Sequence, residues 1–91
     1  MYNLQVMPQA RSDMEPLPHK HLRQIVMKVF SLQDNPRPPD SKKLGRGYRV
    51  DSGEYRILYI IDDAKQLVTI WLVGKRNDDE IYRKAQRRGF L

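Results

Sequence analysis

The stretch GYRVDSGEYRILYIIDDAKQLVTIWLVGKR, residues 47–76, decides the fold of this chain. It contains three β-like runs, and the last two are rich in Ile, Leu, Val and Tyr, which strands favour. The runs span residues 47–51, 55–61 and 67–73. Ser52-Gly53 and residues 62–65 separate them, and each connection is short enough for a hairpin. The stretch therefore predicts an antiparallel meander of three strands.

The N-terminus predicts one more strand and a short helix. Apolar and polar side chains largely alternate over residues 2–7, the period of a half-buried strand. Pro8 suits the first turn of a helix that runs through Met14, and Pro16 and Pro18 would stop it.

A longer amphipathic helix is predicted at about residues 18–33. Five apolar side chains fall at helical spacing on one side of it: Leu22, Ile25, Val26, Val29 and Phe30. Asp34-Asn35-Pro36 would end this helix. Further prolines and glycines then make residues 34–47 a predicted connecting loop.

The last helix has a readable start. Asn77 can cap it while Glu80, three residues later, completes a pair resembling a capping box. Asp78 and Asp79 would lie in the first turn, where the helix dipole favours negative charge. We therefore interpret these acids as helix starters rather than as metal ligands or general bases. Basic side chains suit the last turn, although a basic tail can also grip phosphates: Lys84, Arg87 and Arg88.

The composition points to one basic domain over residues 1–91. The net charge is +6, and residues 41–91 hold twelve basic and seven acidic groups against five and four in residues 1–40. This excess predicts a polyanion or an acidic protein as partner, although a charge that only keeps the protein soluble would look the same. The chain has no cysteine and no segment that reads as a signal peptide or membrane span. The cytoplasm is therefore the expected location.

Two elements carry a resemblance to a known family. The hairpin GYRVDSGEYRILYIID and the strand-to-helix element VTIWLVGKRNDDEIYRKA, with the proline loop before them, look like the RelE branch of the RelE/ParE superfamily of bacterial toxins. The resemblance covers nearly the whole chain. It implies an α+β fold: a small twisted antiparallel sheet, formed by the N-terminal strand and the three-strand meander, with a helical pair on one face and a short C-terminal helix.

The resemblance also implies a site and an activity. Such toxins cleave messenger RNA in the ribosomal A site, and an antitoxin encoded beside the toxin silences them. The matching positions here are Arg49, Arg56, Arg76 and Tyr82. One position departs, because RelE-like sequences commonly carry a basic residue where this chain has Asp51. The basic side chains expected to contact RNA are Lys42, Lys43, Arg46, Lys75 and Arg83.

The chemistry of these residues fits RNA cleavage without a metal or another cofactor. Attack by the 2′-hydroxyl on the neighbouring phosphate builds negative charge that fixed cations stabilise, and arginine binds phosphate oxygens with two parallel donors. Alternation along a strand puts Arg49 and Asp51 on one side and Tyr48 and Val50 on the other. Ordinary cross-strand ion pairs to Asp51 or Glu54 remain an alternative reading of the arginines.

The sequence does not decide which residue transfers protons. Tyr82, Asp51 and Glu54 are the candidates, while His19 and His21 lie far away in sequence and are expected at the surface. Tyr82 could instead pack on the sheet. Three functions therefore remain: an mRNA endonuclease, a gyrase poison of the ParE type, and a basic RNA- or antitoxin-binding module without activity. The short first helix would also leave apolar surface of the 18–33 helix for an antitoxin to cover.

Overall fold

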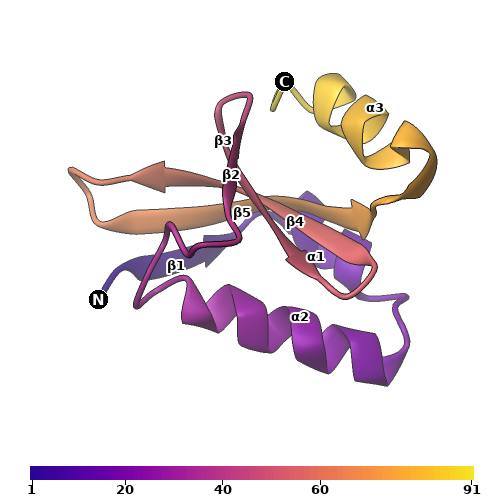
Figure 1. The fold of residues 1–91 in the computed structure, drawn as a ribbon, viewed down its shortest axis with the longest axis horizontal. Coiled ribbons are helices and arrows are strands. Elements are labelled where there is room, and N and C mark those ends of the chain that lie inside the picture. The colour runs from indigo at the N-terminus through magenta and orange to yellow at the C-terminus, as the bar shows by residue number, and fades with distance from the viewer.

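A five-stranded sheet with helices on both faces forms the computed structural model of the chain (Figure 1). The structure describes the backbone of residues 1–91 and every side chain except that of Asp78. The described elements are, in order, β1 (Asn3–Val6), α1 (Pro8–Met14), α2 (His19–Ser31), β2 (Lys42–Leu44), β3 (Gly47–Ser52), β4 (Tyr55–Asp62), β5 (Leu67–Lys75), a 3₁₀ turn η1 (Asn77–Asp79) and α3 (Glu80–Arg87).

The sheet confirms the α+β class and the predicted meander. Its strand order is β1-β5-β4-β3-β2, and β4 pairs antiparallel with both β3 and β5. One detail was wrong: β1 runs parallel to β5, so the sheet is mixed rather than fully antiparallel. Alternating side chains identify a strand, but they carry no information about the direction of the strand beside it.

A fifth strand lies inside the segment that was predicted to be a loop, residues 34–47. β2 pairs antiparallel with β3 at the edge of the sheet. Its sequence Lys-Lys-Leu has no apolar alternation, and short charged strands are typical of sheet edges. The sequence pattern alone therefore does not predict this strand, which is recognised only by its pairing with β3.

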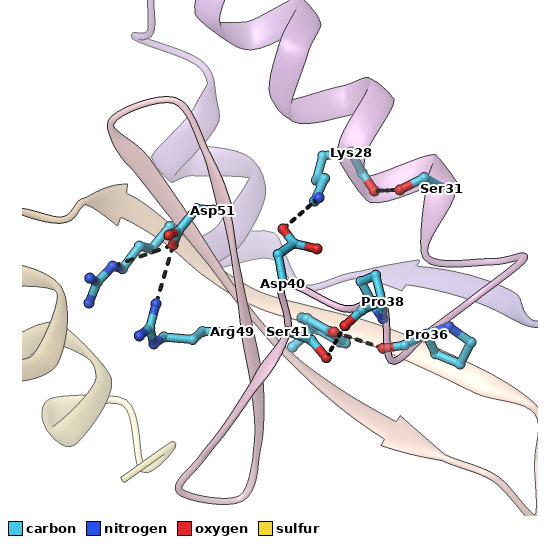
Figure 2. Close-up of polar contacts among 10 residues, drawn as sticks. Lys28, Ser31, Pro36, Pro38, Asp40, Ser41, Arg49 and Asp51 are labelled. Atoms are coloured by element: carbon cyan, nitrogen blue, oxygen red, sulfur yellow. Dashed lines mark hydrogen bonds and ion pairs between the residues drawn. The ribbon is translucent and has the colours of Figure 1, made fainter.

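The proline loop before β2 is fastened to the sheet and to α2. The buried hydroxyl of Tyr59 donates a hydrogen bond to the carbonyl of Pro36 at 2.7 Å, and burial raises the pKa of Tyr59 to about 12. The Nζ of Lys28 lies 2.7 Å from Oδ2 of Asp40 (Figure 2). These contacts fasten the loop to β4 and α2 just before β2 begins.

Both faces of the sheet are covered, which explains the nearly continuous apolar run in β4. The buried core on the α1 and α2 side consists of Ala10, Ile25, Val29, Leu32, Val50, Tyr55, Ile57, Tyr59, Val68, Ile70 and Val73. The smaller buried core on the α3 side consists of Leu58, Leu72, Ile81, Ala85 and Phe90. Alternate residues of β4 therefore serve different cores.

The face of α2 differs in part from the prediction. Ile25 and Val29 are buried, and Leu32 just after the helix is buried with them. Phe30, expected among the core positions, is 57% exposed, and Met27 is 67% exposed. None of the described helices is long and apolar enough to cross a membrane.

The expected cap of the last helix was wrong. Asn77 opens η1, and α3 begins only at Glu80, after Asp79 in a left-handed conformation (φ 57°) with no side-chain capping bond. This turn links the end of β5 to the start of α3. The side chain of Asp78 lies outside the described part. At the far end, Gly89 (φ 78°) folds the chain back so that Phe90 is buried under α3.

Candidate functional site

Two arginines and an aspartate lie together on the face of the sheet that α3 covers. Val50 and Ile57 point into the opposite core, so alternation turns Arg49, Asp51 and Arg56 toward α3. Asp51 lies directly opposite Arg56 in the β3–β4 ladder. The predicted division of β3 into a core side and an outer side is therefore what the structure has.

One carboxylate oxygen joins both guanidinium groups. Oδ1 of Asp51 lies 3.3 Å from Nη1 of Arg49 and 3.5 Å from Nε of Arg56, and Figure 2 shows Arg49 and Asp51 turned toward each other. The side chains of Arg49 and Arg56 are 15% and 18% exposed, whereas that of Asp51 is 41% exposed. The two arginine side chains are therefore mostly buried, and the carboxylate that joins them is more exposed.

Tyr82 completes this cluster from α3. The Nη1 of Arg56 donates a hydrogen bond to the hydroxyl of Tyr82. The neighbouring Ile81 is buried against the sheet, and it approaches Gly74 so closely that a Cβ there would lie 2.8 Å from its Cδ1. Tyr82 also packs partly on the α3-side core, so it both packs and accepts a hydrogen bond. We call Arg49, Asp51, Arg56 and Tyr82 the arginine cluster.

Arg76 lies at the edge of the cluster and does not join it. Its backbone N–H donates to the carbonyl of Glu54 at 3.0 Å, which fixes the end of β5 beside the β3–β4 turn. Its side chain is exposed and makes no hydrogen bond or ion pair with any side chain that the structure describes. Gly74, two residues earlier, is the partner of Arg56 in the ladder. The backbone of Arg76 therefore follows two residues after the position opposite Arg56, and its exposed side chain is not held by another described side chain.

The five residues predicted to contact RNA are divided between two faces. Lys42 pairs with Arg49 across β2 and β3 and shares its face. Lys43 lies over the ring of Tyr48 at 5.2 Å on the opposite face. Lys75 lies opposite Tyr55 in the ladder and so shares the face opposite to that of Arg49. There it lines a cavity of about 190 Å³ between α1, β5 and α3. Arg83 is exposed on α3, next to Tyr82.

Arg46 is tied to the C-terminus rather than free. Its guanidinium group lies 5.1 Å from the ring centre of Trp71, and its Nη1 is 3.4 Å from the carbonyl of Gly89. The register of β4 and β5 shifts between Leu58 and Tyr59, which leaves Trp71 as an extra residue packed on the α3-side core. No sequence pattern predicts this contact.

Neither histidine belongs to the arginine cluster. His21 stands against Tyr55 with ring centres 5.3 Å apart, on the α2 side of the sheet. His19 is exposed at the start of α2. In the described part of the chain, no three His, Asp or Glu side chains gather closely enough to hold a metal ion.

Sequence reasoning missed Asp13, which fastens α3 to α1. Its side chain is only 6% exposed, and its carboxylate receives Arg88 at 2.7 and 2.9 Å and Lys84 at 3.2 Å. It also accepts the backbone N–H of Val73 at 3.1 Å. Burial alone would raise the pKa of Asp13, but these hydrogen bonds and the charge of Lys84 lower it. Lys84 and Arg88 are therefore structural and do not form a phosphate-gripping tail.

A second missed carboxylate, Asp63, leads to a prediction about acid stability. Hydrogen bonds from Arg37 and Tyr2 lower its pKa from 3.8 to about 2. A carboxylate whose pKa is lower in the folded protein stabilises it fully above the unfolded pKa, near ~4, and loses that contribution as the pH falls through the folded pKa. The free energy of unfolding should therefore fall between roughly pH 4 and pH 2. Urea unfolding of the wild type and of a D13N/D63N variant across this range measures it, and an unchanged pH slope in the variant would contradict the assignment.

Comparisons with known proteins agree with this architecture. The family profile described as ParE toxin of type II toxin-antitoxin system, parDE, matches residues 4–80. The RelBE2 toxin-antitoxin complex of Mycobacterium tuberculosis is similar, with 32% identity over 82% of this chain and 98% of that chain, and a TM-score of 0.72. No curated protein matches the chain.

Two structures from Escherichia coli extend the likeness. The isolated RelE toxin is 27% identical over 97% of this chain and 98% of its own, with a TM-score of 0.74. The intact RelBE complex is 25% identical over 85% of this chain and 99% of that chain, with a TM-score of 0.73. The matched span and the similar solved structures thus agree with the resemblance seen in the sequence, and the chain belongs to the ParE toxin family of type II toxin-antitoxin systems, in the RelE branch of the RelE/ParE superfamily.

Proposed function

We propose that this toxin inhibits translation by cleaving messenger RNA in the ribosomal A site. The observation that supports it best is the arginine cluster, in which Asp51 joins Arg49 and Arg56 from neighbouring strands and Arg56 meets Tyr82 from α3. Arg76 stands beside the cluster with an exposed side chain. Arginine side chains gathered in this way suit one phosphodiester.

The proposed reaction needs no group other than the RNA and these side chains. The 2′-oxygen forms a bond to the adjacent phosphorus, the bond from phosphorus to the 5′-oxygen breaks, and the products are a 2′,3′-cyclic phosphate and a 5′-hydroxyl. One proton leaves the 2′-hydroxyl and one is added to the 5′-oxygen. Arg49, Arg56 and Arg76 stabilise the charge that builds on the phosphoryl oxygens. Tyr82, whose hydroxyl accepts a hydrogen bond from Arg56, is the residue of the cluster that we propose carries a proton.

The ribosome is the proposed source of most of the binding energy. The cluster offers contacts to about one phosphate, which is too little to position a free strand. Lys42 and Arg83 extend the contact on the α3 side, and Arg46, held against Trp71, adds its charge there. Lys43 and Lys75 face the other side and would meet only a partner large enough to reach around the sheet, as ribosomal RNA is.

Programmed ribosomes test this function. Purified toxin added to ribosomes with a defined codon in the A site is expected to cut the message within that codon, as read by primer extension. Heat-denatured toxin supplies the blank. An intact message, with the toxin folded and the A site empty of tRNA, would refute the proposal.

A second candidate is poisoning of DNA gyrase, which the ParE name of the matching family favours. This activity would not need the arginine cluster to hold a scissile phosphate. A supercoiling assay distinguishes the two, because inhibition of gyrase with no cut in ribosome-bound message would select the second candidate.

We also propose a cognate antitoxin as partner and the cytoplasm as the site of action. The similar solved structures include complexes of toxin with antitoxin. On α2, Met27 and Phe30 are exposed one turn apart, and the exposed Lys20 and Arg23 lie on the same helix. An antitoxin segment with acidic and apolar side chains would complement this surface.

A further inference from the structure

The carboxylate of Asp51 occupies the place where an anion would bind between two arginines. It is the only acid among the four residues of the arginine cluster, and a single oxygen, Oδ1, lies against both guanidinium groups at 3.3 and 3.5 Å. Arg49 and Arg56 are diagonal neighbours on adjacent strands, close enough to repel one another. An anion between them offsets this repulsion, because both side chains are largely buried.

The contacts of Asp51 are long and leave donors unsatisfied. Charge-assisted hydrogen bonds between nitrogen and oxygen are normally about 2.7–2.9 Å long. Among the described side chains, the Nε of Arg56 is the only buried nitrogen or oxygen atom without a hydrogen-bond partner, although Asp51 is 3.5 Å away. The carboxylate thus neutralises the arginines without saturating them.

The ion pair between Asp13 and Arg88 is a buried pair in the same protein with which the contacts of Asp51 can be compared. Its carboxylate is 6% exposed and holds Arg88 through two short bonds of 2.7 and 2.9 Å. Asp51 is 41% exposed, and its contacts are longer by at least 0.4 Å than either of these bonds. Asp13 therefore has the contacts of a permanent partner of Arg88, whereas Asp51 has those of an anion that another anion can replace.

We propose that Asp51 is a positioning residue that stands in for the substrate phosphate: in the free toxin it holds Arg49 and Arg56 together, and a phosphodiester displaces it when RNA binds. The inference rests on the proposed function for the identity of that anion. It assigns Asp51 a role in competition with the substrate, and not the role of general base.

Phosphate binding in the absence of ribosomes tests the displacement directly. Inorganic phosphate is titrated into the full-length protein while NMR follows the side-chain carboxyl carbons and the Nε–Hε signals of the arginines. The Cγ of Asp51 and the Nε–Hε of Arg56 are expected to shift together. The Cδ of Glu54, an exposed acid on the same hairpin, should stay in place. If Asp51 remains still while Arg56 responds, or if neither responds, the displacement is refuted.

Removing the competing acid should strengthen anion binding. Asp51→Asn is expected to lower the Kd for phosphate roughly three- to ten-fold, which is the size of losing two weak, exposed ion pairs. Glu54→Gln removes the same charge nearby and should change the Kd by less than about two-fold. Equal effects of the two variants would mean that only net charge matters, and the proposal would fail.

The ribosome assay separates positioning from proton transfer. With Asp51→Asn, the KM for programmed ribosomes should fall in parallel with the phosphate Kd, while kcat stays within about three-fold. A kcat that drops by two orders of magnitude or more, with loss of the acid limb of the pH profile, would instead make Asp51 the base. If no message is cut by the wild type but phosphate still moves Asp51, the anion site stands and the nuclease function alone fails.

Discussion

Arg56→Ala is expected to reduce cleavage of ribosome-bound message by about 10²–10³-fold, the usual cost of removing one preorganised donor to transition-state charge. Arg56 is the arginine with two partners in the cluster, since it touches Asp51 through Nε and Tyr82 through Nη1. Its loss removes a cation and also frees Tyr82. The loss should fall on kcat, because charge on the phosphoryl oxygens builds only in the transition state.

The variant Arg56→Lys tests whether charge alone is sufficient. An ammonium group cannot reach Asp51 and Tyr82 at once or bind two phosphoryl oxygens side by side. We therefore expect Arg56→Lys to recover only a small part of the activity, at most about ten-fold above alanine.

A matched control comes from α3. Arg87 is exposed and forms no hydrogen bond or ion pair with any described side chain, so Arg87→Ala removes the same charge from the surface without touching the cluster. Its cleavage rate should remain within about two-fold of wild type. Single-turnover cleavage on programmed ribosomes measures all three variants, with circular dichroism to confirm folding. A fully active, folded Arg56→Ala protein would rule out the proposed site.

The meander was predictable because local and tertiary signals agree there. Residues 47–76 have strand-forming side chains and short turns, and both faces of β4 end up buried, so nothing opposes the local preference. The same alternation placed Arg49 and Asp51 on one face. Two-residue periodicity therefore predicted that Arg49 and Asp51 share a face, whereas Arg56 and Tyr82 were expected from the resemblance to the RelE branch.

Contacts between distant residues were beyond such reasoning. Asp13 meets Val73, Lys84 and Arg88, which are at least sixty positions away, and a lone aspartate in a short helix gives no sign of this. The predictions for β1 and β2 were wrong for a related reason. The direction of β1 and the presence of β2 both depend on the neighbouring strand. Asp79 adopts a left-handed conformation before α3, which packs on the sheet. The local sequence, which predicted a cap at Asn77, carries no information about this packing.

Asp13→Ala is expected to lower the free energy of unfolding by about 3 kcal/mol, because it removes one partner from a buried pair and strands the others. Arg88 and Lys84, whose side chains are only 24% and 22% exposed, would be left without their anion. The N–H of Val73 would lose its acceptor. For a chain of this size the loss corresponds to a Tm lower by roughly 12–20 °C.

Asp13→Asn should cost less than alanine, because the amide oxygen can still accept one hydrogen bond while the negative charge is gone. Asp63→Ala is the matched control. It also breaks a two-bond pair with an arginine, at 2.8 and 3.2 Å, but at the surface, where Asp63 is 56% exposed. Its effect on the Tm should be much smaller than that of Asp13→Ala, since water replaces the lost partner.

The same substitution connects stability with the arginine cluster. Asp13 holds the far side of α3, and Tyr82 on α3 meets Arg56, so a loosened helix should also lose the position of Tyr82. We expect Asp13→Ala to reduce cleavage even at temperatures where the variant is fully folded, while Asp63→Ala leaves it unchanged. Thermal unfolding together with cleavage at 20 °C and below the new Tm measures both effects. If Asp13→Ala unfolds at the wild-type temperature, Asp13 is not what keeps α3 on the sheet.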